Sequence, residues 1–422
     1  MYIKELTIKN LKGIESLQFD FARPNGKYAG WTVLTGDNGS GKSSVLKAIC
    51  LALVARDYRR VLQPSLKGWI KQGADTASVS MVVERGKNDA FAQKGRTTII
   101  PIHIGLEILR NNGSQPILKE TGKTNIAERS LWAPDTKGWF FCAYGPFRRV
   151  FGASADAQRY MVGEGTERVV TLFKEDASLA EVNQWLVSED HKRKDKNLDS
   201  IKKLEEMQKL LSDNLLPNGF TISDINSEGL WLKDKNGNTL SWEEMSDGYR
   251  SLVALLADIF RHVMNAFGTN GIIKQNTDGL WICSKEGVVL IDEIDAHLHP
   301  EWQREIGFWL KSRFPNIQFI VTSHSPIICQ AADENGLFHL PEPGSEDLPF
   351  QLSKEEHLKI IASTPTQILL RPAFGLESTY SPLANEKRKR YAELSAKQRA
   401  GAELLESEQK EIEALKIFAE AR

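Results

Sequence analysis

Gly36-Asp37-Asn38-Gly39-Ser40-Gly41-Lys42-Ser43 matches the pattern G-x-x-x-x-G-K-[ST] at every position. The glycines of this pattern, the P-loop, let successive backbone N–H groups form a concave nest for phosphate oxygens. The lysine reaches the outer phosphates, and the final hydroxyl can bind Mg²⁺. The stretch therefore predicts a site for ATP and Mg²⁺, with Ser43 on the metal and with nucleotide contacts from Gly36, Asn38, Gly39, Ser40, Gly41, Lys42, Ser43 and Ser44.

The flanks of the P-loop support the same interpretation. Trp31 to Thr35 is a run typical of a strand, and Ser44 to Val54 is a mostly apolar run typical of a packed helix. A helix that begins at the loop directs the positive end of its dipole toward the phosphates. An ordinary glycine-rich turn before a helix is the alternative, and the strand–loop–helix order argues against it.

A second predicted strand carries the acidic groups that phosphate hydrolysis needs. Val288 to Ile291 is a short apolar run typical of a buried parallel strand, and Asp292 and Glu293 follow it directly. We expect Asp292 to hold Mg²⁺ through water and Glu293 to polarise the attacking water as general base. Two acids at a strand end can arise by chance, but rarely in a chain that also has a complete P-loop.

Two further groups complete the candidate site. Gln318 to Val321 predicts another parallel strand, and His324 follows it at the edge where ligands usually bind. A neutral imidazole there can hydrogen-bond the γ-phosphate, although an isolated histidine at a strand end is more often structural. Ser246 and Gly248 open a predicted helix, Met245 to Phe260, and form a second anion nest. Within one chain this second nest is redundant, because the P-loop already binds the phosphates. It has a function if it binds the nucleotide that is held by a second copy of the chain.

The bulk composition is that of a globular protein without an overall attraction to nucleic acid. The chain has 422 residues, of which 41% are hydrophobic and 26% charged, and its net charge is −1. Its four widely spaced cysteines are predicted to be small buried side chains, and neither a signal-peptide pattern nor a run long enough to span a membrane is present. We therefore expect a soluble, cytoplasmic protein. Direct DNA binding would need a local patch, and solvated helix faces explain more simply the basic runs at 56–60, 192–194 and 387–390.

The order of these motifs resembles that of the ABC-type ATPase head. The P-loop, a downstream signature, the Asp-Glu strand end, an Asp-containing loop and a switch histidine follow one another as in that family. The opening run from Ile8 to Ile14 is similar to the start of the SMC, RecF and OLD (overcoming lysogenisation defect) ATPases, which implies that Lys12 helps to hold the nucleotide. The resemblance implies an α/β fold, in which a P-loop sheet with helices is joined by an antiparallel β subdomain, a short helical insertion and a helical C-terminal tail.

Four regions are expected from this resemblance. They are a first half of the head with the P-loop (1–165), a helical insertion (166–220), a second half of the head (221–345) and a helical C-terminal region for oligomerisation or partner docking (346–422). A helical cap on the head's own core is an equal alternative for the last region. Within the insertion, Ser178 to Glu181 is expected to be a helix start, with a cap residue and an acid three residues later. In the last region we expect an ion pair between Glu406 and Lys410 and an apolar stripe formed by Leu405, Ile412 and Leu415.

Two features depart from the family pattern. ABC heads carry a glutamine after an early strand, where it contacts Mg²⁺ and the attacking water. The corresponding stretch here, Phe141 to Arg148, has no glutamine, and Gln158 lies too far along the chain to be assigned. SMC proteins also carry a long coiled coil between the halves of the head, whereas this insertion has only tens of residues, which argues against a long tether.

The resemblance further implies a head-to-tail pair of chains. Each ATP would lie between the P-loop of one chain and Ser246 and Gly248 of the other, with Asp295 at the seam. ATP would close the pair, and hydrolysis, with Lys42, Glu293 and His324 as catalytic groups, would open it. ATP can favour the closed state only as far as it binds that state better.

Three functions are compatible with such a head. The first is the ATPase subunit of a prokaryotic anti-phage defence complex, similar to that of the Septu-type systems, which senses or gates a separate nuclease because no nuclease pattern follows residue 340. The second is a RecF-like DNA-repair clamp without a nuclease partner. The third is a transporter ATPase, which the SMC-like N-terminus and the unusual signature disfavour. We favour the first function.

Overall fold

A six-stranded sheet forms the centre of the computed structural model, which describes residues 1–90, 101–111, 114–122, 124–133, 138–148, 150, 165–211, 219–401 and 403–420. The strand order is β16–β15–β3–β14–β13–β7, and every neighbouring pair is parallel except β16 with β15. The parallel strands therefore end at one edge of the sheet, where the candidate site residues follow them. The strands are β3 (Gly30–Gly36), β7 (Phe141–Tyr144), β13 (Gly287–Ile291), β14 (Ile317–Thr322), β15 (Leu337–Leu340) and β16 (Phe350–Gln351).

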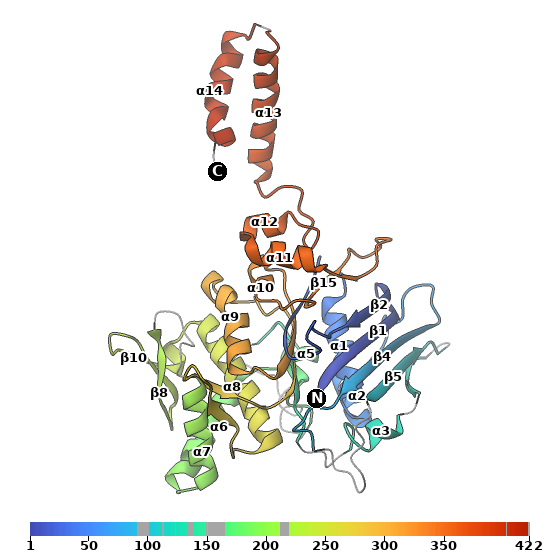
Figure 1. Ribbon diagram of the computed structural model, residues 1–422, viewed down its shortest axis with the longest axis vertical. Helices are drawn as coiled ribbons and strands as arrows, with labels where there is room; N and C mark the ends of the chain where they lie inside the picture. The colour runs from blue at the N-terminus through green and yellow to red at the C-terminus, as the bar shows by residue number, and fades with distance from the viewer. Residues whose placement is uncertain are drawn as a thin grey trace. The chain divides into compact units, whose positions relative to one another are not determined.

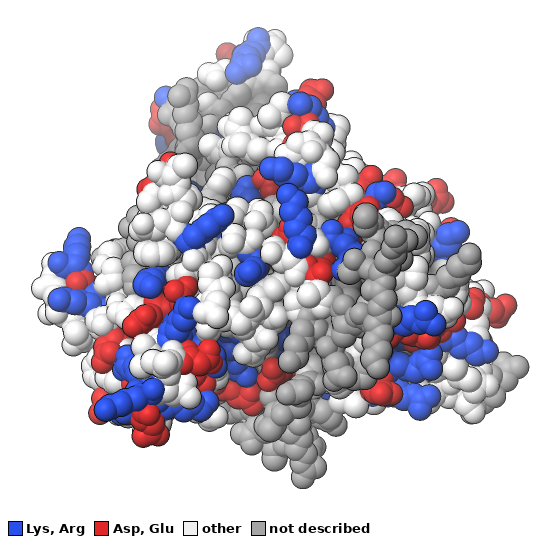
Figure 2. Space-filling model, turned by 60° about the horizontal axis from the view of Figure 1, so that its bottom comes forward, with Lys and Arg blue, Asp and Glu red and all other residues white. Residues whose placement is uncertain are grey.

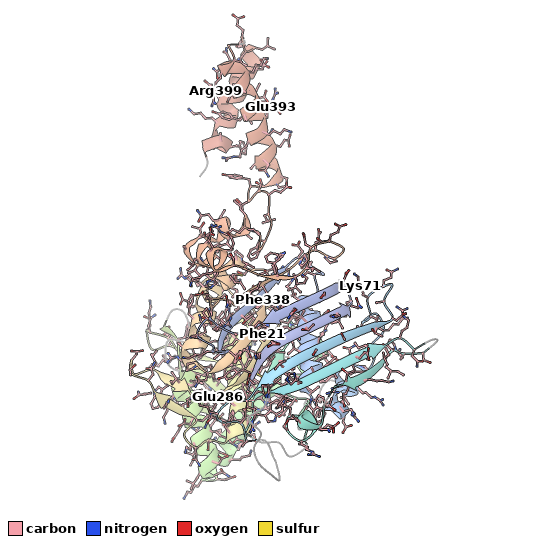
Figure 3. All side chains as sticks on the ribbon, turned by 45° about the vertical axis from the view of Figure 1, so that its right-hand side comes forward. Phe21, Lys71, Glu286, Phe338, Glu393 and Arg399 are labelled. Carbon is pink, nitrogen blue, oxygen red and sulfur yellow. The ribbon has the colours of Figure 1, made fainter. Side chains whose placement is uncertain are left out.

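A five-stranded antiparallel sheet packs beside the central sheet (Figure 1). The amide of Gln318, in β14, joins the two sheets because it accepts a hydrogen bond from Ile3 N at 2.7 Å and donates one to Ile3 O at 2.8 Å. Phe21 and Phe338 also lie side by side between them, with ring centroids 5.6 Å apart (Figure 3). The strands of this second sheet, in spatial order, are β2 (Ile14–Asp20), β1 (Tyr2–Leu11), β4 (Thr76–Glu84), β5 (Ile102–Leu109) and β6 (Ile117–Thr121).

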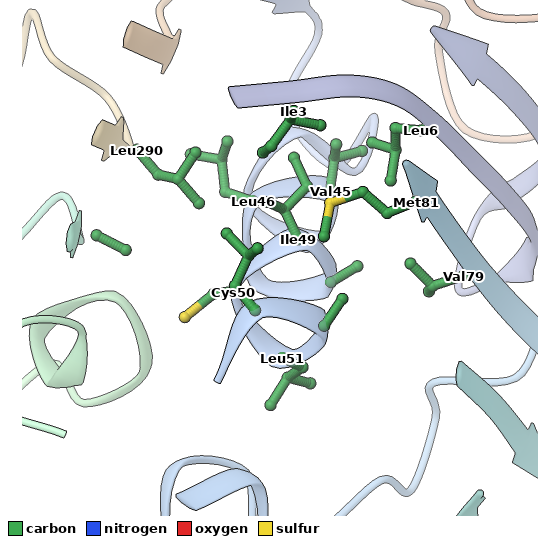
Figure 4. Close-up of a cluster of buried hydrophobic side chains, with 14 of the residues drawn as sticks. Ile3, Leu6, Val45, Leu46, Ile49, Cys50, Leu51, Val79, Met81 and Leu290 are labelled. Carbon is green, nitrogen blue, oxygen red and sulfur yellow. The ribbon is translucent and has the colours of Figure 1, made fainter. Parts of the chain in front are cut away.

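Helix α1 (Lys42–Leu53), which follows the P-loop, is buried between the two sheets. It is apolar on nearly every side, as expected of a helix in a protein core. Val45, Leu46 and Ile49 are among its buried side chains, and they lie close to residues of β1, β4 and β13 in Figure 4. The start of α1, and with it the P-loop, is therefore held in place by the core of the molecule.

The other side of the central sheet is covered by helices (Figure 1). Helix α8 (Asp247–Phe267) buries its apolar face there, and α9 (Pro300–Arg313) links β13 to β14. The expected ABC-type α/β head, with its antiparallel subdomain and its short helical insertion, is confirmed. The remaining elements of this part are α2 (Arg56–Leu62), α3 (Asn125–Glu128), α5 (Val170–Phe173), α6 (Ala180–Lys194), α7 (Leu198–Leu211), β8 (Thr221–Asn226), β9 (Gly229–Lys233), β10 (Thr239–Ser241), β11 (Ile273–Gln275), β12 (Trp281–Cys283) and α10 (Pro326–Cys329).

The chain divides into two compact units, residues 1–362 and 363–422. The first unit ends with α11 (Lys354–Ala362), and the second contains α12 (Pro365–Leu369), α13 (Pro382–Arg399) and α14 (Glu406–Glu420). Helices α13 and α14 form a hairpin held by ion pairs such as Lys397–Glu408 at 2.8 Å. The expected pair of Glu406 with Lys410 is present at 2.8 Å, but Leu405 is 67% exposed and does not join a buried stripe with Leu415.

Two local predictions are wrong. Helix α6 begins at Ala180, with Leu179 in the cap position, and Glu181 does not cap the helix. The side chain of Glu181 instead lies in a partly buried cluster with Arg261, where burial raises the pKa of Glu181 to about 7. Arg59, in the first basic run, is not on a solvated face. It is only 4% exposed because it pairs with Glu120 and stacks on Trp132, 4.4 Å from the ring centroid.

The expectation for the cysteines is confirmed. All four cysteines are free and buried, which raises the pKa of each thiol. Among the described residues, no helix is both long and apolar enough to cross a membrane.

Candidate functional site

The backbone of the P-loop has a shape that only glycine adopts easily. Gly36, Gly39 and Gly41 have φ angles of 139°, 83° and 97°, in the region that other residues avoid. A Cβ atom on Gly36 would also lie 2.2 Å from the carbonyl oxygen of Leu340 in β15. The loop is therefore a tight cradle whose geometry depends on these glycines.

This cradle has the features of an anion site. The N-terminus of α1 is capped by no side chain, and its first turn contains no acidic residue. The buried hydroxyl of Ser40 has no hydrogen-bond partner. Lys42 Nζ donates to the loop carbonyls of Gly36 and Asp37, each at 2.8 Å. Free donors, a positive helix end and a fixed ammonium group fit a nucleotide triphosphate, as the sequence predicts.

Lys42 also faces the acids that follow β13. Burial lowers the pKa of Lys42, and the negative charges of Asp292, Glu293 and Asp295 oppose that shift. The P-loop and the strand-end acids therefore converge, although they are far apart in the sequence. Ser43, in the first turn of α1, and Asp292 offer the hydroxyl and carboxylate oxygens that Mg²⁺ prefers.

The turn after β13 is fixed by Thr322, the last residue of β14. Thr322 Oγ1 donates to Asp292 Oδ1 at 2.6 Å and accepts from Glu293 N at 2.7 Å. Glu293 has a φ of 45°, an unfavourable value for a residue with a side chain. Sequence reasoning missed Thr322, although the register of two parallel strands points to it.

Arg148 is a second residue that sequence reasoning missed. It lies in the Phe141–Arg148 stretch, which β7 brings beside β13 by parallel pairing. Its guanidinium donates to the carbonyl oxygens of Gly145, Asp292, Glu293, Ile294 and Ala296, at 2.9–3.3 Å. Burial lowers the pKa of Arg148 to about 10, opposed by the nearby acids, so the side chain stays charged at neutral pH. Gln158 lies outside the described residues.

The signature residues lie on the start of α8 and leave their anion nest open. Ser246 is the exposed cap residue, and its side chain makes no hydrogen bond to the helix. A Cβ atom on Gly248 would lie 2.7 Å from His297 O, so this glycine allows α8 to approach the loop that contains Asp295. Among the described residues, no hydrogen bond joins Ser246 to the P-loop of the same chain.

The remaining two candidates lie at the rim of the site. His324 is exposed directly after β14, at the edge where the P-loop and the acids lie. Lys12 has its ammonium group 5.1 Å from the centroid of the Trp69 ring, and burial and the nearby charge of Lys47 lower its pKa. It lines a cavity of about 610 Å³ together with Gly39 and Ser40, so it borders the space next to the P-loop.

Comparison with known proteins agrees with this arrangement. The family described as "AAA domain, putative AbiEii toxin, Type IV TA system" matches residues 31–330, which contain every candidate site residue except Lys12. The chain belongs to this AAA domain family. With the fold, this membership confirms the expected resemblance to the ABC-type ATPases of the SMC/RecF group.

Several known proteins are similar in sequence to this AAA domain protein. The chain is 29% identical over 330 residues to a Septu protein PtuA of Bacillus mycoides (strain KBAB4), across 77% of this chain and 38% of the relative. It is 25% identical over 396 residues to a Septu protein PtuA of Bacillus thuringiensis, across 91% of this chain and 86% of the relative. It thus spans well under half of the first relative and most of the second. A Retron Ec83 probable ATPase of Escherichia coli is 43% identical over 109 residues, 25% of this chain and 18% of that protein.

Solved structures give a fold-level comparison. An SMC head bound to the C-winged helix domain of ScpA has a TM-score of 0.49 and 18% identity, and the match covers 84% of this chain and 99% of that one.

Proposed function

We propose that this chain is the ATP-hydrolysing subunit of a cytoplasmic, Septu-type anti-phage defence complex that works as a head-to-tail dimer or higher oligomer. The observation that carries the enzymatic part is the convergence of Lys42 with Asp292 and Glu293 at one edge of a parallel sheet. The similarity to a Septu protein over 91% of the chain supports the biological setting. The matched RecF protein covers only 23% of the chain, so a repair clamp has less support.

The residues of the site divide the chemistry among them. Bound Mg²⁺–ATP supplies the phosphoanhydride bond and the cation that neutralises its oxygens. The P-loop N–H groups and Lys42 would hold the phosphates, while Ser43 and Asp292 would hold the metal. Water would attack the γ-phosphorus and ADP would leave, while Glu293, whose backbone N–H group donates to Thr322, would accept the proton of that water. His324 would hydrogen-bond the γ-phosphate.

A second chain is proposed to complete the site. Ser246 is exposed at an uncapped helix start, which leaves backbone donors free for an anion from outside the chain. Asp295 is partly exposed, and it lies in the loop that approaches the signature helix at Gly248. Both observations support a shared site in which Ser246, Gly248 and Asp295 face the nucleotide of the other copy.

A separate nuclease is the proposed effector, and the helical second unit is its proposed docking element. Direct DNA contact by this chain has little support from surface charge. On the face that Figure 2 shows, Lys and Arg side chains are interspersed with Asp and Glu. In the second basic run, Lys192, Arg193 and Lys194 all pair with the acids Glu189 and Asp190.

Disulfide cross-linking tests the shared site. Asn38 in the P-loop and Ser246 in the signature are exposed, whereas every native cysteine is buried, so an engineered cysteine would be the accessible thiol. Chains with Asn38→Cys are mixed with chains that carry Ser246→Cys, and mild oxidation is followed on a non-reducing gel. We expect an ATP-dependent dimer that contains one chain of each kind.

Chains with Ser312→Cys provide the matched control for the second partner, because Ser312 is exposed at the far end of α9. They are expected to give no ATP-dependent dimer with Asn38→Cys chains. Equal cross-linking of the control and the signature variant, or none with either, would exclude the head-to-tail arrangement.

A further inference from the structure

In the turn that contains Asp292 and Glu293, the backbone N–H groups and the backbone carbonyl groups form hydrogen bonds with different parts of the molecule. The N–H groups of Asp292 and Ile294 donate to the carbonyl oxygens of Tyr144 and Thr322, at 2.8 and 3.1 Å. The N–H group of Glu293 donates to the Thr322 hydroxyl. The donors are therefore held by the two neighbouring strands, β7 and β14.

Four carbonyl oxygens of the same turn accept hydrogen bonds from one side chain, and one of them, Glu293 O, also accepts from Ala296 N at 2.9 Å. Arg148 Nη1 donates to Asp292 O at 2.9 Å, and Arg148 Nη2 donates to the carbonyl oxygens of Glu293, Ile294 and Ala296. Arg148 is 4% exposed, so little water can take its place. Buried carbonyl groups that lose their partner are costly. The backbone is also left-handed at Glu293, within this turn, and at His297, directly after it.

Arg148 is also anchored to the helix that carries the signature. Ser251, one turn into α8, donates its hydroxyl hydrogen to the backbone oxygen of Arg148 at 3.1 Å. The guanidinium group also donates a hydrogen bond to the backbone oxygen of Gly145, three residues earlier in the same loop, at 3.1 Å. One residue thus connects β7, the signature helix and the catalytic turn.

We infer that Arg148 is a positioning residue that holds the Asp292–Ala296 turn in the geometry that aims Glu293. This inference rests on the proposed ATPase function, because it assigns Glu293 the role of base. Arg148 acts through the backbone of the turn and touches no reacting atom. A lysine is a poor replacement, because the planar guanidinium group of arginine donates to several carbonyl groups at once and the compact ammonium group of lysine cannot do so.

Substitution of Arg148 should separate turnover from binding. In Arg148→Met, kcat is expected to fall about 100-fold, the usual effect of a misplaced catalytic group. The Kd for ATP should change less than about threefold, because the P-loop lies on β3 and α1 and its lysine keeps its own loop contacts. In Arg148→Lys, kcat is expected to fall about tenfold. This variant replaces Arg148→Met in the test if the methionine variant does not fold. Wild-type kcat in the lysine variant would overturn the inference.

A double-mutant cycle with Glu293→Gln gives the sharper test. If Arg148 acts through Glu293, the double variant should hydrolyse ATP in a single turnover as slowly as Glu293→Gln alone. If the two losses multiply, Arg148 acts independently of the base and the inference fails. Wild-type turnover in Glu293→Gln itself would instead refute the proposed base, whatever Arg148→Met does, so the two failures are distinguishable.

Arg313→Met provides the control for general destabilisation. Arg313 is 2% exposed, is remote from the candidate site and donates to the backbone oxygen of Trp281 at 3.3 Å. This variant should lower Tm without a selective loss of kcat. A fall in kcat equal to that of Arg148→Met, with Kd unchanged, would contradict a specific role for Arg148.

Discussion

Lys42→Ala is expected to weaken ATP binding about 100-fold or more. Lys42 is 6% exposed and its ammonium group is held between two loop carbonyls, so it is already placed for the phosphates before ATP binds. The third N–H donor of Lys42 is left for phosphate, and a charge-assisted hydrogen bond contributes about 1.5–3 kcal/mol, the upper part of which corresponds to about 100-fold in Kd. The variant also removes a cation that acts on Asp292 and Glu293, so the site becomes more repulsive to an anion.

The measurement is calorimetric titration with ATP and Mg²⁺, with Lys311→Ala as control. Lys311 also donates to a backbone carbonyl and to an acid, Ala331 O at 2.7 Å and Asp333 at 2.9 Å, but Asp333 bonds to the opposite end of β3, at Trp31. The control should keep wild-type affinity. ATP affinity within threefold of wild type in Lys42→Ala would refute the assignment of the P-loop.

Glu293→Gln is expected to retain ATP binding but to hydrolyse ATP about 100- to 1,000-fold more slowly, which is the usual contribution of a general base. Glutamine has nearly the same shape and can still hydrogen-bond water, but its amide cannot accept the proton. Because the backbone of residue 293 is fixed by Thr322, the substitution should change the chemistry and not the turn. ATP should therefore accumulate in the paired state, which sedimentation with ATP and Mg²⁺ would reveal.

Glu286→Gln is the matched control for this variant. Glu286 directly precedes β13, at the end of the strand opposite to the candidate site, and it is buried and accepts a hydrogen bond from Asn88 N at 3.1 Å. Its turnover should stay within about twofold of wild type, because no group of the site depends on it. Normal turnover in Glu293→Gln, or slow turnover in both variants, would remove Glu293 as the base.

The parts of the site that the sequence predicts are those encoded in short segments. The P-loop, the Asp292-Glu293 strand end and the helix after Ser246 each depend on neighbours in the chain, so residue type and spacing are enough to recognise them. The parallel sheet follows from the apolar runs, and its shared edge explains why Asp292 lies near Lys42 and why His324 follows a strand at the same edge.

The parts that the sequence does not predict depend on contacts between distant segments. Arg148 looks like any other arginine in a loop, and only the pairing of β7 with β13 brings it under the catalytic turn. Arg59 lies in a run of charges and becomes a core residue because Glu120 and Trp132 surround it. Glu181 has the spacing of a helix cap, but it faces a buried cluster once α8 packs nearby.

The most direct test of a nucleotide site shared by two chains is complementation between two inactive variants. Lys42→Ala lacks the P-loop half, and Ser246→Arg places a bulky charge in the signature half, so each variant alone should be inactive. In an equal mixture, half of the dimers would pair one chain of each kind, and each mixed dimer would contain one intact site. ATPase activity should therefore rise to about one quarter of the wild-type value. Activity in the mixture that merely equals the mean of the two separate variants would contradict the shared site.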